Sequence, residues 1–188
     1  MKLEIFDHKI ENKDYTVNEF NYTEAYDCIF SNCNFMEALL ENKKFFDCEF
    51  IQCNLSIVNL CNASIRGCKF NNCKVMGANW ASTSRFEDCI FSNCQLSSST
   101  FMGQDLRNCK FKNSILTDVD FSECNLKKVI FENCDLEGST FRETDLSEAD
   151  FTTAKKYEIN PKYNNIKGSK FSLPEALSLL TGLDIKIV

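Results

Sequence analysis

The 188-residue chain has little proline, glycine or histidine, with two Pro, six Gly and one His. The single histidine, His8, nearly excludes Ser-His-Asp and Cys-His catalysis, and no phosphate-binding or dinucleotide-binding glycine motif is present. No window approaches 18 consecutive apolar residues, and the first eight residues lack the pattern of a signal peptide. We therefore expect a cytoplasmic protein with no membrane partner and with no catalytic residues, cofactor or metal ion.

Phenylalanine and cysteine are abundant instead, with 17 Phe and 12 Cys, and both follow a five-residue period. From Phe20 to Trp80, and again from Phe86 to Phe151, every fifth residue is large and apolar except Ala25. One extra residue, within 81–85, separates the two series and predicts a bulge. A period of five fits neither an amphipathic α-helix nor a single β-strand, so it indicates a solenoid.

Eleven of the twelve cysteines lie two residues before these apolar positions, in a slot that also holds Ala, Ser, Val and Thr. Such a slot is typical of small inward side chains, and in a reducing compartment the cysteines would be free thiols. The series Cys28, Cys48 and Cys68 recurs every twenty residues, so four pentapeptides complete one coil. The five-residue spacing does not match the close cysteine pairs of zinc sites. Cys61, outside the slot, should face outward, which leaves a redox-sensing role for this thiol as a further hypothesis.

One repeat reads Cys109-Lys110-Phe111-Lys112-Asn113, which is a small residue, a polar residue, Phe and two polar residues. This pattern resembles the pentapeptide-repeat proteins over roughly residues 15–151. The resemblance implies an all-β fold, a right-handed quadrilateral β-helix of about seven coils, each rising by about 4.8 Å. We expect residues 1–14 to form an N-terminal cap and residues 152–188 an irregular final coil with a C-terminal cap. One corner repeats an amide, which predicts hydrogen bonds along the rod between Asn32, Gln52, Asn72, Asn93, Asn113 and Asn133.

The C-terminal segment has the pattern of a short amphipathic α-helix followed by a strand. Ser172 and Glu175 have the spacing of a capping box, and apolar residues then recur on one helical face. Residues 170–180 are similar to the segment by which quinolone-resistance pentapeptide-repeat proteins dimerise, so the cap is also a candidate homodimer interface. Its expected residues are Leu173, Ala176, Leu177, Leu180, Leu183, Ile185 and Ile187.

Charge is distributed unevenly along the repeats. Residues 66–112 carry a net charge of +4, whereas residues 117–150 carry −7. The acidic stretch occupies roughly 8 Å of rod, where duplex DNA would carry about five charges. It therefore predicts a partner-binding acidic surface that comprises Asp118, Asp120, Glu123, Asp135, Glu137, Glu143, Asp145, Glu148 and Asp150.

The resemblance to the quinolone-resistance group implies a non-enzymatic interaction protein. Such a protein would act as a DNA mimic that binds DNA gyrase or topoisomerase IV and modulates the enzyme or protects it from quinolones. The net charge of −6 argues against direct binding of nucleic acid. The unbroken register leaves no room for the long loops that many gyrase-protecting members carry. The alternative is a structural or scaffolding rod with an unrelated protein partner.

Overall fold

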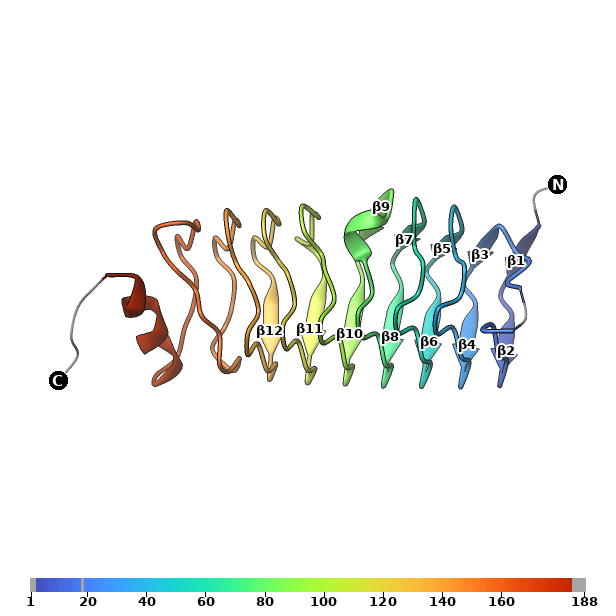
Figure 1. Cartoon of the computed structure of the whole chain (residues 1–188), viewed down its shortest axis with the longest axis horizontal. Helices are drawn as coiled ribbons and strands as arrows, with labels where there is room; N and C mark the ends of the chain where they lie inside the picture. The colour runs from blue at the N-terminus through green and yellow to red at the C-terminus, as the bar shows by residue number, and fades with distance from the viewer. Residues whose placement is uncertain (1–2, 18, 184–188) are drawn as a thin grey trace.

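The computed structural model describes residues 3–17 and 19–183, and they form a parallel β-solenoid. Figure 1 shows an elongated rod in which β1 lies near one end and the C-terminal helix at the other. Each coil contributes short three-residue strands that pair with the equivalent strands of the coils before and after it. The all-β repeat fold expected from the five-residue period is confirmed.

Face 1 of the rod contains a five-stranded parallel sheet, in the order β1-β3-β5-β7-β9. Its strands are β1 (Glu4–Phe6), β3 (Glu24–Tyr26), β5 (Lys44–Phe46), β7 (Ser64–Arg66) and β9 (Arg85–Glu87). Face 2 contains a seven-stranded sheet with one strand from each of seven coils. These strands are β2 (Lys9–Glu11), β4 (Ile29–Ser31), β6 (Glu49–Ile51), β8 (Lys69–Asn71), β10 (Ile90–Ser92), β11 (Lys110–Lys112) and β12 (Ile130–Glu132).

Two further faces are joined by single bridges rather than strands. Face 3 runs through the bridged residues 14, 34, 54, 74, 95, 115, 135 and 155, and face 4 through 39 and 59 and through 79, 100, 120 and 140. Because the two sheets begin at β1 and β2, the coils of the solenoid start before residue 15. It also continues past residue 151, because Asp150 is bridged to Lys170.

The extra residue predicted within 81–85 coincides with a short 3-10 helix, η1 (Trp80–Ser82). Ser64 pairs with Arg85, which is 21 residues later, whereas Lys44 pairs with Ser64 after 20. The turn is closed by the Thr83 N–H, which donates to the carbonyl of Trp80 at 3.1 Å. The chain therefore absorbs the insertion without losing the pairing of β7 with β9.

The interior is filled by stacked columns of like side chains. On face 2 the rings of Phe30, Phe50, Phe70, Phe91, Phe111, Phe131 and Phe151 stack with centroids 4.7–5.5 Å apart. All seven are at most 2 % exposed. Because each coil places the same residue type above its predecessor, burial and ring stacking reinforce each other along the rod.

The inward slot is filled by free thiols, and every cysteine except Cys61 is buried. Several thiols donate to a carbonyl of the preceding coil, as Cys53 does to Phe30 and Cys73 does to Phe50, both at 3.3 Å. Burial raises the pKa of Cys109 to about 12. These side chains therefore behave as small core residues with a weak donor.

Left-handed backbone at the corners explains the abundance of Asn and Asp there. Many residues that end a pentapeptide have φ between about 48° and 64°, and short polar side chains tolerate this conformation. Glycine suits the corner next to Asp118, because Gly138 has φ 71° and a Cβ there would require the Asp118 carboxylate to move. In the predicted amide column, Asn133 Nδ2 donates to Asn113 Oδ1 at 3.0 Å.

The C-terminal helix is present, but the prediction of an α-helix is wrong. The segment η2 (Glu175–Leu183) is a 3-10 helix. Its first turn includes a hydrogen bond from the Leu177 N–H to the carbonyl of Pro174, three residues earlier, at 3.0 Å.

The two residues of the expected capping box bind the preceding coil instead of the helix terminus. The Ser172 hydroxyl donates to the carbonyl of Thr152 at 2.6 Å, and the Glu175 carboxylate accepts the N–H of Lys156 at 3.1 Å. With both side chains occupied, neither caps an α-helical first turn. These bonds fasten the helix to the last coil.

Face 1 is interrupted in the middle of the rod. Its sheet ends at β9, and the ladder resumes only with the bridge between Asp105 and Asn125. Within the described residues, no backbone hydrogen bond joins 84–88 to 104–108. The other three faces are continuous at this level, through the pairing of β10 with β11 and the bridges of Gln95 with Ile115 and Thr100 with Asp120. We call this interruption the face 1 seam.

Candidate interaction surface

The described residues contain no group of three or more His, Cys, Asp or Glu side chains placed to hold a metal ion. The only histidine, His8, is exposed, and its Nδ1 lies 2.6 Å from the carbonyl of Phe6. Cys61 faces solvent, as the repeat predicts. No helix in the described part of the chain is long and apolar enough to span a membrane.

The nine acidic residues expected to form one surface are distributed around the whole rod. Bridges place Asp135 on face 3, Asp120 on face 4, Asp145 on face 1 and Asp150 on face 2. Asp118, Glu123, Glu143 and Glu148 lie at corners with positive φ, and Glu137 lies beside Asp135 on face 3. The structure therefore brings together subsets of these residues rather than all nine.

On face 3 the negative charge is balanced by a lysine of the next coil. The Lys156 ammonium lies 2.9 Å from the Asp135 carboxylate and 2.6 Å from that of Glu137. Hydrogen bonds to Glu137 and Asp135 raise the pKa of Lys156 above its ordinary value. Lys155, which is bridged to Asp135 on the same face, supplies a second positive charge, so the cluster presents little net charge to a partner.

On faces 1 and 2 the negative charges are also paired with lysines, but at longer distances. Glu148 lies 3.6 Å from the Lys127 ammonium and 3.5 Å from that of Lys128, and Asp150 lies 3.6 Å from Lys170. Partial burial raises the pKa of Asp150, but hydrogen bonds from Thr152 outweigh it, so the pKa lies below its ordinary value. The charge of these carboxylates is shared with neighbouring lysines.

Face 4 and its two corners hold the largest group of neighbouring carboxylates without lysine partners among the described residues. Asp145 on face 1 is the other acidic residue of the nine without an ion pair among those residues. Asp118, Asp120, Glu123 and Glu143 lie on face 4 and its corners, on two successive coils, and we call them the acidic patch. In the described part of the chain, the first three have no ion pair, and Glu143 has a 3.5 Å contact with Arg142 Nε. Asp120, Glu123 and Glu143 line a hollow of about 250 Å³ together with Met102, Ser122 and Arg142.

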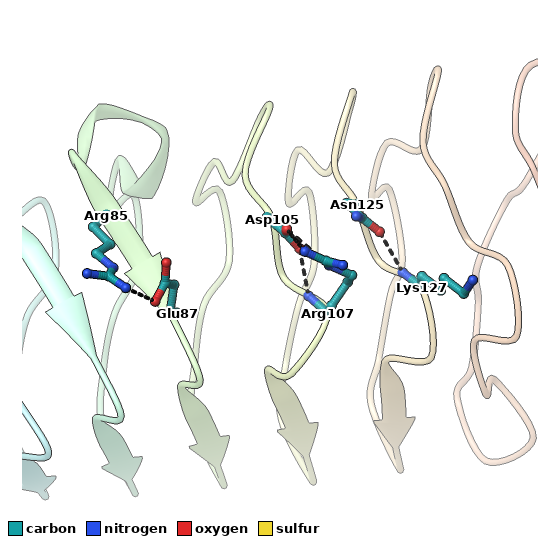
Figure 2. Close-up of polar contacts among 6 residues, drawn as sticks. All are labelled: Arg85, Glu87, Asp105, Arg107, Asn125 and Lys127. Carbon is teal, nitrogen blue, oxygen red and sulfur yellow. Dashed lines mark hydrogen bonds and ion pairs between the residues drawn. The ribbon is translucent and has the colours of Figure 1, made fainter.

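Near its seam, face 1 carries arginines that are paired with carboxylates. Figure 2 shows Arg85 with Glu87 on β9, Asp105 with Arg107 one coil later, and Lys127 on the coil after that. Arg85 lies 2.8 Å from Glu87, and Arg107 lies 2.7 Å from Asp105. The positive charge of residues 66–112 indicated a basic region, but the seam leaves no sign in the sequence, because residues 86–151 keep a regular five-residue step.

Of the seven residues expected at a homodimer interface, two are clearly exposed. Leu173 is 76 % exposed and Leu177 43 %. Ala176 and Leu180 are half-buried. Leu183 ends η2, and its side chain, like Ile185 and Ile187, lies outside the described residues. The end of the rod thus presents a small apolar surface.

A parallel β-solenoid with five-residue repeats, Cys-filled slots and four faces defines the class of protein. Two family models match the chain: a pentapeptide repeat region over residues 84–171 and pentapeptide repeats in eight copies over residues 44–79. Together they cover about two thirds of the sequence. The chain belongs to the pentapeptide-repeat family.

Solved structures of the same fold include QnrB1, described as a plasmid-mediated fluoroquinolone resistance protein. Its full-length form is 17% identical with a TM-score of 0.62, and the match covers 97% of this chain and 100% of that chain. A trypsin-treated variant is 18% identical with a TM-score of 0.61 and full coverage of both chains. HetL, involved in heterocyst differentiation regulation in Nostoc sp. strain PCC 7120, is 17% identical with a TM-score of 0.48, covering 91% and 87%. No curated protein matches the chain significantly by sequence.

Proposed function

We propose that this chain is a non-enzymatic interaction protein that binds a type II topoisomerase, DNA gyrase or topoisomerase IV. It would occupy part of the enzyme's DNA-binding surface and would thereby modulate the enzyme or protect it from quinolones. The proposal places the protein in the cytoplasm with its target. The observation that carries it is the acidic patch, because three of its four neighbouring carboxylates have no ion pair in the described part of the chain, whereas four of the other five acidic residues are paired with lysines.

The spacing of the acidic patch supports binding to a surface shaped for DNA. Coils in a parallel sheet repeat at about 4.8 Å, so Glu123 and Glu143, which occupy one corner on successive coils, stand at a regular short interval. Duplex DNA carries a charge every 1.7 Å of its axis on average. The interval between carboxylates in the patch is longer than this average spacing. The patch therefore imitates a short stretch of one phosphate strand rather than a full duplex. The full-length structural likeness to a fluoroquinolone resistance protein supports the same target class.

Dimerisation through the C-terminus is part of the proposal. Leu173 and Leu177 are exposed at the end of the rod, where the last coil has no successor to cover it. End-to-end contact would bury these leucines and would bring two acidic patches to either side of the centre of the dimer.

Gyrase supercoiling assays, with and without a quinolone, test the proposal. The protein should inhibit supercoiling or restore it in the presence of the drug at micromolar concentration. A variant with Asp118→Lys, Asp120→Lys and Glu123→Lys should lose this effect by at least about tenfold in concentration, because attraction becomes repulsion.

The matched control reverses three exposed carboxylates near the other end of the rod, with Glu19→Lys, Glu37→Lys and Glu41→Lys. Glu37 occupies the same kind of corner as Asp118, so both triple variants change the net charge by the same amount on equivalent positions. An equal loss of the effect on supercoiling in both triple variants would show that only net charge matters. The proposal would be refuted if the native protein had no effect on either topoisomerase.

The scaffolding alternative is favoured by a different observation. Exposed apolar side chains gather around the corner between faces 3 and 4 in the N-terminal coils, namely Met36, Leu39, Ile57 and Met76. A scaffold that binds an unrelated protein through this corner would keep its partner in the Asp118, Asp120 and Glu123 variant. Pull-down with native and variant protein separates the two functions.

A further inference from the structure

Within the described residues, Arg107 and Asn108 at the centre of the turn over residues 106–109 make no backbone hydrogen bond to the coils on either side, whereas the Leu106 N–H donates to the carbonyl of Asn125 at 2.9 Å. The Cys109 N–H donates to the carbonyl of Leu106 at 2.9 Å, which closes a four-residue turn. The next turn on this corner has the usual form, with Lys128 at φ 64° and its N–H donating to the carbonyl of Ser147. Asn108, at the equivalent place, is not among the described residues with positive φ.

This difference in the turn explains the missing hydrogen bonds. A positive φ at the third turn residue sets one orientation of the central peptide, and a negative φ reverses that orientation. In the described part of the chain, the Asn108 N–H accordingly has no bond to Lys127, and the Asp88 N–H has none to Arg107. Both bonds have counterparts on neighbouring coils, such as the bond from the Gly67 N–H to the Glu87 carbonyl at 3.0 Å. The reversal turns the Asn108 N–H away from Lys127 and toward the coil of Asp88, without a hydrogen-bond partner among the described residues.

A hollow of about 540 Å³ lies beside this turn, within the size range of small-ligand sites. It is lined by Arg107, Asn108, Cys109, Lys110, Lys127, Lys128 and Ile130. Four of these side chains are cationic and none is a carboxylate. The carboxylates within ion-pair distance of these cations are Asp105, paired with Arg107, and Glu148, which Lys127 and Lys128 share. Asp88 lies in the neighbouring hollow that Arg107 and Asn108 also line.

The balance of these charges leaves a surplus of about two positive charges at the hollow. Lys110 has no ion pair among the described residues. A phosphate monoester carries about −1.5 to −2 charges at neutral pH, with three acceptor oxygens, and so matches this surplus in charge and in hydrogen-bonding capacity. Ile130, 46 % exposed, adds an apolar surface beside the cations.

We propose that the hollow at the 106–109 turn binds the phosphate group of a small ligand. Lys110, Lys127 and Lys128 surround the phosphate, and Arg107 contributes one edge of its guanidinium. Ile130 contacts the part of the ligand that bears the phosphate. This site is independent of the acidic patch, which lies on face 4 and its corners, away from the corner between faces 1 and 2.

Isothermal titration and amide NMR at low ionic strength test the site, with inorganic phosphate and AMP as probes. Saturable binding should shift the amide resonances of residues 106–110 and 127–130. Tighter binding of AMP than of phosphate identifies a nucleotide-like ligand that uses Ile130, and equal binding identifies the phosphate alone. Affinity should fall as pH drops below about 6, where phosphate loses its second charge.

Two substitutions and a matched control sharpen the test. Lys110→Gln should raise the dissociation constant about tenfold, because a charge-assisted contact is lost. Lys69→Gln removes the equivalent lysine of face 2 on a regular coil, where Lys69 pairs with Ile90, and should change the constant less than about twofold. Asp105→Asn should tighten binding by removing the carboxylate that competes for Arg107.

Circular dichroism establishes that each variant is folded before binding is compared. The absence of saturable shifts at phosphate concentrations up to about 10 mM would overturn the proposal, because that range exceeds the dissociation constant of a weak specific site. Equal weakening by Lys110→Gln and Lys69→Gln would overturn it as well, since it would indicate nonspecific attraction to the rod.

Discussion

The face 2 column of phenylalanines should carry a large share of the stability of the rod, and Phe111→Ala tests this. Phe111 is fully buried and is stacked between Phe91 and Phe131, with centroids 5.5 and 5.4 Å away. It also meets Phe101 and Phe121 edge to face, both at 5.8 Å. Truncation of a buried Phe costs about 3–5 kcal/mol, and loss of these ring pairs favours the upper part of that range.

Denaturant unfolding followed by the fluorescence of the single Trp80 measures the loss of unfolding free energy, because this side chain is completely buried. Phe111→Leu should cost less than about 1.5 kcal/mol, since leucine is similar in size and fills equivalent positions on other faces. Phe6→Ala is the control for an exposed ring, because Phe6 is 54 % exposed and stacks only on Tyr26. A loss below about 1 kcal/mol for Phe111→Ala, or one equal to that of Phe6→Ala, would refute the reasoning.

Three other predictions concern thiols, assembly and acid stability. Thiol titration of the folded protein should modify Cys61 rapidly and Cys109 only after unfolding, since burial raises the pKa of Cys109 to about 12; rapid reaction of several thiols would contradict the buried slots. Leu177→Glu should halve the mass measured by light scattering if η2 joins two chains, and a native mass equal to one chain would exclude the dimer. Hydrogen bonds from Arg107 hold the pKa of Asp105 below its ordinary value. This pair therefore stabilises the fold fully at pH values above the pKa of Asp105 in the unfolded chain, which is about 3.9. The stabilisation is lost as the pH falls through the lower pKa of Asp105 in the folded protein. The stability difference between native protein and Asp105→Asn should therefore be constant above about pH 5 and shrink in more acidic solution; a difference that is independent of pH would contradict the assignment.

The sequence predicts the solenoid well because every level of structure obeys the same period. Large apolar residues at every fifth position, together with cysteines at every twentieth, determine which side chains point inward and which coils stack. Phe30 above Phe50 could therefore be predicted without a structure, and the rings are parallel within 15°. The extra residue near Ser82 was also visible, since it shifts the register of all later repeats.

Features that depend on backbone conformation at single positions could not be predicted in this way. Asn108 is as suitable for a left-handed corner as Asn113, yet only Asn113 has positive φ. The type of the C-terminal helix depends on Ser172 and Glu175 binding the last coil instead of the helix terminus, a choice that their spacing does not reveal.

The acidic surface was predicted from composition alone. Which of its residues lie together depends on the geometry of the coils. The lysine that compensates Asp135 lies 21 residues later, at Lys156, one coil away on the same face. A count of charges along 117–150 omits that lysine. The candidate site could be located to a pair of coils from the sequence, but the choice of Asp118, Asp120 and Glu123 within it required the structure.

The face 1 seam has a mechanical consequence. A rod of stacked coils transmits tension through four parallel ladders of hydrogen bonds, and between 84–88 and 104–108 the described residues provide only three. Under an axial load the elastic resistance is reduced there and is asymmetric, because the missing ladder lies on one side. In the described part of the chain, the bridges of face 4 are likewise interrupted between Asn59 and Asn79. The rod should consequently bend most easily at these two levels, opening on face 1 at the seam and on face 4 near η1, so that its parts can tilt to follow a curved surface.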